Sequence, residues 1–94
     1  DFVRKFYFDE AFMGAEGIDT EYGISLPHLE EGLTKQAIAR QANTVFVVTD
    51  HSKFSIKTLY SYADYNDIDY IITDSNPDFN MSSFENDKIK IVKV

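Results

Sequence analysis

The stretch Thr44–Lys53, TVFVVTDHSK, decides the fold. Its first half is a continuous run of β-branched and aromatic residues, and its second half is polar or charged. A run without polar alternation is typical of a strand that is covered on both faces, as in a parallel sheet. Because ligands of open α/β sheets bind outside the carboxyl ends of the strands, this stretch predicts a buried strand that leads directly into a binding site.

The segment before this strand predicts a helix from about Pro27 to Asn43. Pro27 suits the first helical turn, and Asn43 can end the helix. Gly32 inside the helix costs about 1 kcal/mol relative to alanine. Apolar residues recur about every four positions, which predicts one buried stripe of a helix. The stripe consists of Leu29, Leu33, Ala37, Ile38 and Ala42.

Other segments predict further strands and turns, and together they indicate the fold class. Strands are expected at Phe8–Ala15, Asp69–Asp74 and Lys88–Val94, turns at Glu16–Gly23 and Asn76–Asn80, and a helical turn at Ser82–Asp87. The segment 56–67 fits either a strand or a helix. Strands that alternate with helices predict an α/β fold with a mostly parallel sheet flanked by helices.

Composition excludes several classes of function. The chain has 94 residues, enough for one small domain, and a formal charge of −7 from 16 acidic and nine basic residues. Such a chain repels phosphate backbones, so it is a poor candidate for touching DNA itself. It has no cysteine, which excludes disulfides and thiolate metal sites and suits a reducing compartment, so we expect a cytoplasmic protein. No apolar run approaches the roughly 20 residues that span a bilayer, and no membrane partner is expected.

The chain begins at Asp1 without an initiator methionine. We interpret it as a piece of a larger protein. A binding site can therefore be divided between this piece and the remainder.

Polar side chains follow two of the expected strands. Parallel strands would bring Gly14–Asp19, after the first strand, to the same sheet edge as Asp50–Lys53. A lysine such as Lys53 suits a phosphate, and backbone N–H groups around glycines can add donors. The residues that could converge are Glu16, Asp19, Asp50, His51, Ser52 and Lys53. The alternative is a pair of ordinary polar loops in which Asp50 caps local N–H groups, and the residues alone leave both interpretations open.

Cofactor and metal motifs are weak. The sequence has no P-loop, and the GAEG stretch at Gly14–Gly17 is not a dinucleotide fingerprint, so no cofactor is expected. The acidic stretch Asp64–Asp69 resembles a calcium loop only superficially, because it lacks the central glycine and the terminal glutamate, and no metal site is expected.

Three ordered motifs resemble the C-terminal effector-sensing domain of DeoR-type bacterial transcriptional repressors. The resemblance covers about residues 8–75. The motifs are Phe12-x-Gly14-Ala15-x-Gly17-Ile18-Asp19, then Asp50-x-Ser52-Lys53, then Asp67-Ile68-Asp69 running into Ile72-Thr73-Asp74. Each motif alone is weak, but their order and spacing are fairly specific.

This resemblance implies a function and a site. Residues 1–94 would be the C-terminal portion of a sugar-phosphate sensor with a ribose-5-phosphate isomerase/CoA transferase-like fold. The DNA-binding winged helix-turn-helix and the first part of the sensor, with its Gly/Thr-rich phosphate-binding loop, would be missing. The protein would be a homo-oligomer that contacts operator DNA only through the missing domain. The effector would be a phosphorylated sugar, with Gly14, Gly17 and Asp19 at the sugar and Lys53 at the phosphate.

The related ribose-5-phosphate isomerases look similar over the same stretch. Met13 stands where those enzymes carry an acid, and Lys35 or Gln36 stands where they carry the proton-shuttling acid of the helix. Moving a proton between carbon atoms requires a positioned base, so the residues argue against an enzyme. Two nearby acids, Glu30 and Glu31, could substitute. A sugar-phosphate isomerase fragment is therefore the alternative.

The tyrosine-rich stretch Tyr60–Tyr70 supports a third interpretation. Its tyrosines could stack on a ligand, but such residues more often belong to sheets and interfaces. The chain would then be an oligomerisation module without a ligand.

Overall fold

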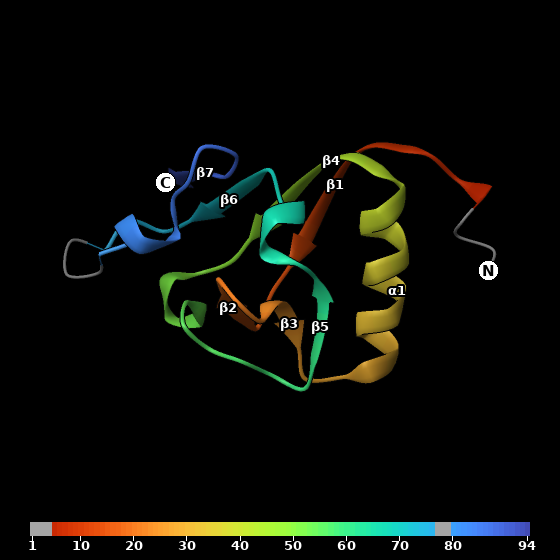
Figure 1. Cartoon of the computed structure of the whole chain (residues 1–94), viewed down its shortest axis with the longest axis horizontal. Helices are drawn as coiled ribbons and strands as arrows, with labels where there is room; N and C mark the ends of the chain where they lie inside the picture. The colour runs from red at the N-terminus through yellow and green to blue at the C-terminus, as the bar shows by residue number, and fades with distance from the viewer. Residues whose placement is uncertain (1–4, 77–79) are drawn as a thin grey trace.

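Two sheets and one long helix make up the fold (Figure 1). The structure is a computed structural model that describes residues 5–76 and 80–94. The strands are β1 (Phe8–Gly14), β2 (Gly17–Asp19), β3 (Gly23–Leu26), β4 (Ala42–Val48), β5 (Tyr60–Ala63), β6 (Tyr70–Thr73) and β7 (Lys90–Lys93). The helix is α1 (Leu29–Gln41), and short 3₁₀ turns are η2 (His51–Lys53), η3 (Tyr65–Asp67) and η4 (Ser82–Phe84).

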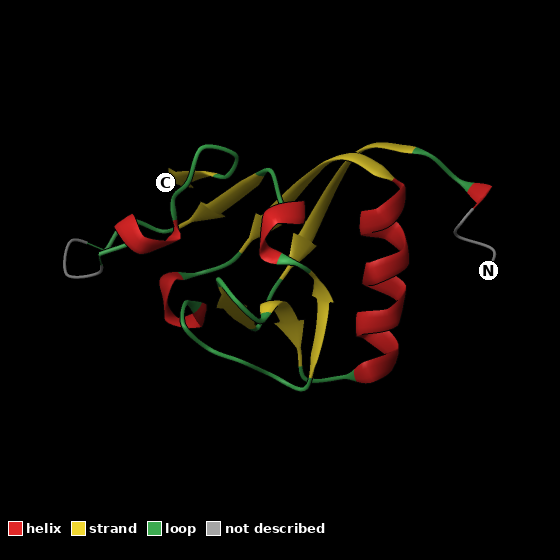
Figure 2. Cartoon of the chain, in the orientation of Figure 1, coloured by secondary structure: helices red, strands yellow, loops and turns green. Residues whose placement is uncertain are grey.

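The larger sheet has four strands in the order β1-β4-β6-β7, and every neighbouring pair is parallel. A smaller antiparallel sheet, β2-β3-β5, lies beneath it in the view of Figure 2. The expected α/β fold with a mostly parallel sheet is therefore confirmed. The ambiguous segment 56–67 contains strand β5 followed by η3, and the expected helical turn is η4.

The smaller sheet corrects one expectation. The segment 16–23, expected to be a turn, contains β2 and the start of β3, which pair in the register Ile18↔Ile24. Both isoleucines are fully buried. These strands are too short to show a visible alternation of polar and apolar residues. Their pairing also depends on residues that lie far away in the sequence, such as Tyr60 opposite Leu26.

The helix also differs from the expected stripe. Leu29 and Leu33 are about half exposed, and Gly32 is the buried residue of α1. A Cβ atom at Gly32 would lie 2.6 Å from the Tyr60 ring, so the glycine makes room for that ring against the helix. Ile38 lies farther along α1 and packs against the core. Within the described residues, α1 included, no helix is both long and apolar enough to cross a membrane.

The core lies between the two sheets. The expectation that β4 is covered on both faces is therefore wrong for the described residues. Val45 and Val47 are buried, whereas Phe46 is half-buried and Val48 is exposed. The elements that cover the parallel sheet in the described chain all pack on the side of Val45 and Val47. The turn expected at 76–80 falls on residues 77–79, outside the described residues.

We expect Ile71→Ala to destabilise the protein by about 2–5 kcal/mol, because Ile71 is fully buried and the change leaves a cavity. The matched surface variant Leu59→Ala should stay within about 0.5 kcal/mol of the wild type, because Leu59 is exposed. Urea unfolding midpoints measure both values. Equal midpoints for the two variants would contradict this assignment of the core.

Candidate functional site at the sheet edge

A short parallel bridge joins the segments that follow β1 and β4. Ile18 of β2 pairs with Phe54, and the Ser55 N–H donates to the Ile18 carbonyl oxygen at 2.7 Å. Ser55 adopts a positive φ of 66°, which turns the chain away after this contact. The structure therefore brings the two polar motifs, Gly14–Asp19 and Asp50–Lys53, side by side at the carboxyl edge of the parallel sheet.

Lys53 and Glu16 form the ion pair at this junction. The Lys53 Nζ lies 3.2 Å from the Glu16 Oε1, and the side chains are 31% and 52% exposed. The Glu16 backbone N–H donates to the Ser25 carbonyl oxygen at 3.0 Å, which fixes its position against β3. Lys53 thus presents its charge at a solvent-accessible edge, with a carboxylate as its current partner.

Asp50 shapes the turn that carries Lys53. Its Oδ1 accepts a hydrogen bond from the Ser52 N–H at 2.9 Å and a second one from the Ser52 hydroxyl. The Ser52 hydroxyl, followed by the Ser52 N–H, holds the pKa of Asp50 below its usual value. Asp50 therefore caps a local N–H group, as one of the two interpretations of the sequence expected, and Ser52 is its partner.

His51 connects the ends of β4 and β6. Its backbone N–H donates to the Asp74 Oδ1 at 2.7 Å, and its ring Nδ1 lies 2.7 Å from the Asp74 Oδ2. Its Nε2 lies 2.8 Å from the Asn76 Nδ2. The sequence placed His51 among the side chains that could converge at this edge, but it gave Asp74 no role at the site. The signal was available, because Asp74 follows a strand expected to be parallel to β4.

Asp19 closes the turn between β2 and β3. Its Oδ2 accepts hydrogen bonds from the Tyr22 N–H at 2.7 Å and the Glu21 N–H at 3.0 Å, and its Oδ1 lies 3.8 Å from the Lys57 Nζ. The Tyr22 N–H is the main cause that lowers the pKa of Asp19, against the opposing effect of burial. These partners give Asp19 a structural role within its own turn.

The two glycines of the first motif differ in their surroundings. A Cβ atom at Gly17 would lie 2.4 Å from the Ile56 carbonyl oxygen and 2.6 Å from the Ser25 Oγ, so packing alone requires a glycine there. A Cβ atom at Gly14 would meet nothing within 4 Å. The Gly14 carbonyl oxygen accepts a hydrogen bond at 2.8 Å from Tyr62, whose pKa is raised by burial, so its hydroxyl stays a donor.

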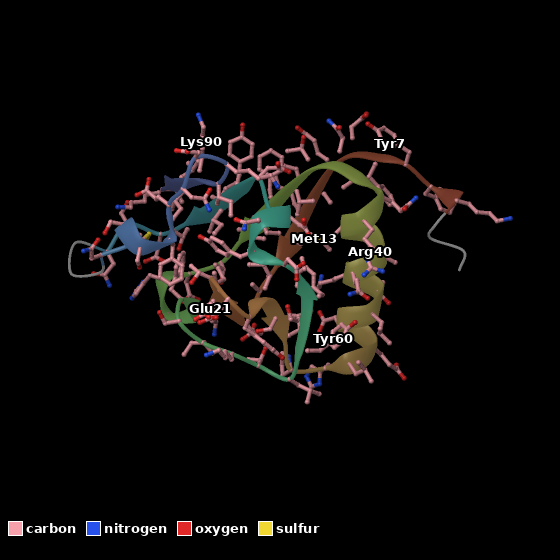
Figure 3. All side chains as sticks on the ribbon, viewed as in Figure 1. Tyr7, Met13, Glu21, Arg40, Tyr60 and Lys90 are labelled. Carbon is pink, nitrogen blue, oxygen red and sulfur yellow. The ribbon has the colours of Figure 1, made fainter. Side chains whose placement is uncertain are left out.

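A separate open cleft of about 330 Å³ lies between α1 and β5. Its lining includes Arg40, Asp64 and Asp67, and Figure 3 shows Arg40 on the helix and Tyr60 on the neighbouring strand. None of the residues predicted for the site lines this cleft. Among residues 5–76 and 80–94, no three His, Asp or Glu side chains are grouped as a metal ion would require.

Met13 and Gln36 stand at positions where the isomerases carry acids, and the structure gives both side chains other roles. Met13 is buried in the core beneath the parallel sheet. The Gln36 Oε1 accepts a hydrogen bond from the Tyr60 hydroxyl at 3.0 Å. Neither side chain can serve as a base that moves a proton between carbon atoms.

We expect Gly17→Ala to destabilise the protein by about 1–3 kcal/mol, because the added methyl group overlaps backbone and side-chain atoms that cannot both move away. Gly14→Ala is the matched control, and it should change the free energy of unfolding by less than about 0.5 kcal/mol. Denaturant unfolding of both variants measures the difference. A Gly17→Ala protein as stable as the wild type would contradict the packing role.

We expect Asp74→Asn to flatten the acid limb of the pH–stability profile. The His51 N–H, and then the His51 ring, lower the pKa of Asp74 from its usual 3.8. A carboxyl group with a lowered pKa in the folded state stabilises the fold above its usual pKa, and this stabilisation is lost as the pH falls below about 4. Unfolding midpoints measured from pH 6 downward test this. Parallel acid limbs for the wild type and the variant would show that the Asp74 charge does not contribute.

The family model described as the DeoR C terminal sensor domain matches residues 1–75. The HTH-type transcriptional repressor GlcR of Bacillus subtilis (strain 168) is 40% identical over 75 residues, which cover 80% of this chain and 29% of that protein. The glycerol-3-phosphate regulon repressor of Escherichia coli (strain K12) is 31% identical over 77 residues, which cover 82% of this chain and 31% of that protein.

A third relative extends the match almost to the end of the chain. The uncharacterized HTH-type transcriptional regulator FruR of Bacillus subtilis (strain 168) is 33% identical over 91 residues, which cover 97% of this chain and 36% of that protein. The chain thus spans about a third of the length of these relatives. Their names are those of transcriptional regulators, which confirms the expectation of a regulatory domain rather than an enzyme. The family model and these identities show that the chain belongs to the DeoR C-terminal sensor domains.

Proposed function

We propose that this chain senses a phosphorylated sugar for a DeoR-type repressor of sugar-metabolism genes, and that the phosphate group binds Lys53. The observation that carries the proposal is the placement of Lys53. It is a partly exposed lysine at the carboxyl edge of a parallel sheet, held on a capped turn beside a glycine-containing motif. This is the edge at which open α/β sheets bind ligands.

A phosphate group can compete with Glu16 for this lysine. The Lys53–Glu16 pair is partly exposed, and pairs of this kind contribute only about 0–1 kcal/mol. A phosphate offers more negative charge and more acceptor oxygens than one carboxylate. The pair therefore keeps Lys53 extended toward the site without blocking it. Displaced from Lys53, the Glu16 carboxylate is free to accept hydrogen bonds from sugar hydroxyl groups.

The other residues proposed for the site, Gly14, Gly17 and Asp19, contribute mainly by setting the shape of the backbone. Gly14 lies beside open space, so a sugar ring can approach its backbone closely. Gly17 and Asp19 maintain the β2 strand and its turn, because Gly17 is tightly packed and both Asp19 oxygens have partners. In this proposal the sugar contacts the backbone of the Gly14–Asp19 motif. The Asp19 carboxylate contributes indirectly, because it stabilises the turn between β2 and β3.

The regulatory output belongs to the remainder of the protein. We assign residues 1–94 to the C-terminal portion of the sensor and operator binding to a winged helix-turn-helix outside it. The charge of −7 disfavours DNA contact by this chain, and the chain covers about a third of its relatives. One relative is named for a regulon of glycerol 3-phosphate, a small phosphorylated metabolite. In a cytoplasmic homo-oligomer, an effector that prefers one quaternary arrangement would change the affinity for DNA.

We expect Lys53→Ala to weaken phosphosugar binding by the full-length protein roughly ten- to a hundredfold, because a charge-assisted hydrogen bond contributes about 1.5–3 kcal/mol. The measurement is a thermal-shift titration against a panel of phosphorylated sugars and their unphosphorylated counterparts. A ligand at a hundred times its dissociation constant stabilises the native state by about 2.7 kcal/mol.

Lys57→Ala is the matched control. Lys57 also follows β4 and also pairs with an acid of the first motif, but it is more exposed and lies 3.8 Å from Asp19. Its removal should leave phosphosugar affinity within about threefold of the wild type, as expected for a surface charge with a weak partner. Equal losses of phosphosugar affinity in the two variants would show that Lys53 is not part of the binding site. A protein that binds no phosphosugar would refute the proposed function.

A further inference from the structure

The turn that carries Lys53 leaves the sheet at its carboxyl edge. The backbone hydrogen bond from the Thr49 N–H to the Ile72 carbonyl oxygen, at 3.0 Å, still joins β4 to β6. The three residues of η2 follow, and the Lys53 and Phe54 N–H groups donate within the turn at 3.2 Å and 3.3 Å. A short 3₁₀ turn with such long hydrogen bonds does not by itself fix its direction relative to the sheet.

Contacts at both ends attach this turn to the rest of the fold. At its far end, Phe54 is buried and pairs with the smaller sheet. At its near end, His51 contacts Asp74, the residue that follows β6. A segment that is held at one end can pivot, whereas a segment that is held at both ends keeps one direction. The contact with Asp74 therefore decides how the turn presents Lys53.

Both oxygens of the Asp74 carboxylate contact His51. The Oδ1 accepts a hydrogen bond from the His51 backbone N–H at 2.7 Å, and the Oδ2 lies 2.7 Å from the ring Nδ1. The Asn76 amide nitrogen lies 2.8 Å from the ring Nε2. Because an amide nitrogen only donates, the Nε2 accepts, and the ring proton lies on the Nδ1 that faces the carboxylate. One charged side chain thus fixes the backbone and the ring of His51 together, through the stronger, charge-assisted kind of hydrogen bond.

The charge of Asp74 by itself disfavours an anion at this edge. The Ser52 hydroxyl is the main cause that lowers the pKa of Asp50, while Lys53 lowers this pKa further and Asp74 raises it. The charges of Asp50, Lys53 and Asp74 therefore act on one another. A carboxylate in this position repels a phosphate bound to Lys53, so removal of its charge alone would strengthen phosphate binding. If Asp74 instead holds the turn, its removal weakens phosphate binding.

We infer that Asp74 is a positioning residue for phosphate binding, which holds His51 so that η2 presents Lys53 at the sheet edge. This role depends on the proposed function, because it takes the phosphate group to bind Lys53. Asp74 acts on the phosphate only through that lysine. The end of β6 thereby contributes to the affinity of a site whose proposed ligand contacts follow β1 and β4.

Asp69 offers a matched control at the other end of β6. Its Oδ2 accepts a hydrogen bond from the Val45 N–H at 2.9 Å, across 24 positions of sequence, and the Asp74 bond to the His51 N–H spans 23 positions. Asp69→Ala therefore removes a comparable bond from a carboxylate to a backbone N–H. It does so at the opposite edge of the sheet from Lys53, so it should affect stability without affecting the turn.

The first measurement is amide hydrogen exchange in the full-length protein without ligand. The side chain of Asp74 is 42% exposed, so Asp74→Ala should fold. We expect this variant to speed exchange at the Lys53 and Phe54 amides at least about tenfold, because these amides are protected only while the turn is ordered. Both donate to carbonyl oxygens of the turn rather than to Asp74. Asp69→Ala should leave them unchanged. Equal exchange in the wild type and Asp74→Ala would overturn the inference.

The second measurement is the affinity of the full-length protein for hexose 6-phosphates, ribose 5-phosphate and inorganic phosphate. We expect Asp74→Ala to weaken binding about tenfold, although it removes a negative charge. Asp74→Asn removes the same charge but keeps an oxygen for the His51 N–H, so it should bind within about threefold of the wild type. In a Lys53→Ala background, Asp74→Ala should change the affinity by less than about twofold, because its effect passes through that lysine.

Unchanged or tighter binding by Asp74→Ala would overturn the inference. So would an equal loss of affinity in the Lys53→Ala background, or an equal loss from Asp69→Ala. A wild-type protein that binds none of these probes would refute the proposed function, and with it the role of Asp74 in phosphate binding. Faster exchange at Lys53 and Phe54 in Asp74→Ala would in that case still show that Asp74 holds the turn, so the two failures are distinguishable.

Discussion

The bridge between Ile18 and Phe54 is the contact on which the rest of the structure depends. Ile18 is fully buried, and Phe54 packs edge-on against Phe84 with ring centroids 4.8 Å apart. This bridge holds the smaller sheet against the segment that follows β4, at the carboxyl edge of the larger sheet. Glu16 lies just before β2 and Lys53 just before Phe54, so the contact that closes the core also brings together the two charges of the candidate site.

Local patterns were sufficient to predict the parts of the fold that depend on local sequence. The apolar run at β4 and the similar run at β6 predicted buried parallel strands, because no polar residue interrupts them. Their parallel direction then predicted that polar groups after β1 and β4 would meet at one edge. The capping role of Asp50 was also predictable, since its partner Ser52 is only two residues away.

Contacts between distant residues could not be predicted. β2 and β3 are strands because they pair with each other and with β5, and a stretch with two glycines gives no sign of this. The helix buries Gly32 instead of its leucines because the Tyr60 ring lies against it. His51 and Asp74 are 23 positions apart, so no local pattern linked them before β4 and β6 were paired. The apolar outer residues of β4 predicted burial, but Val48 is exposed among the residues that the structure describes.

The most direct test of the account is a crystal structure of the full-length protein with a phosphorylated sugar that stabilises it. We expect a phosphate oxygen within about 2.7–3.2 Å of the Lys53 Nζ, with the Glu16 carboxylate moved away from the lysine and the sugar beside the Gly14 backbone. A phosphate bound elsewhere, for example at Arg40 in the cleft between α1 and β5, with the Lys53–Glu16 pair intact, would contradict it.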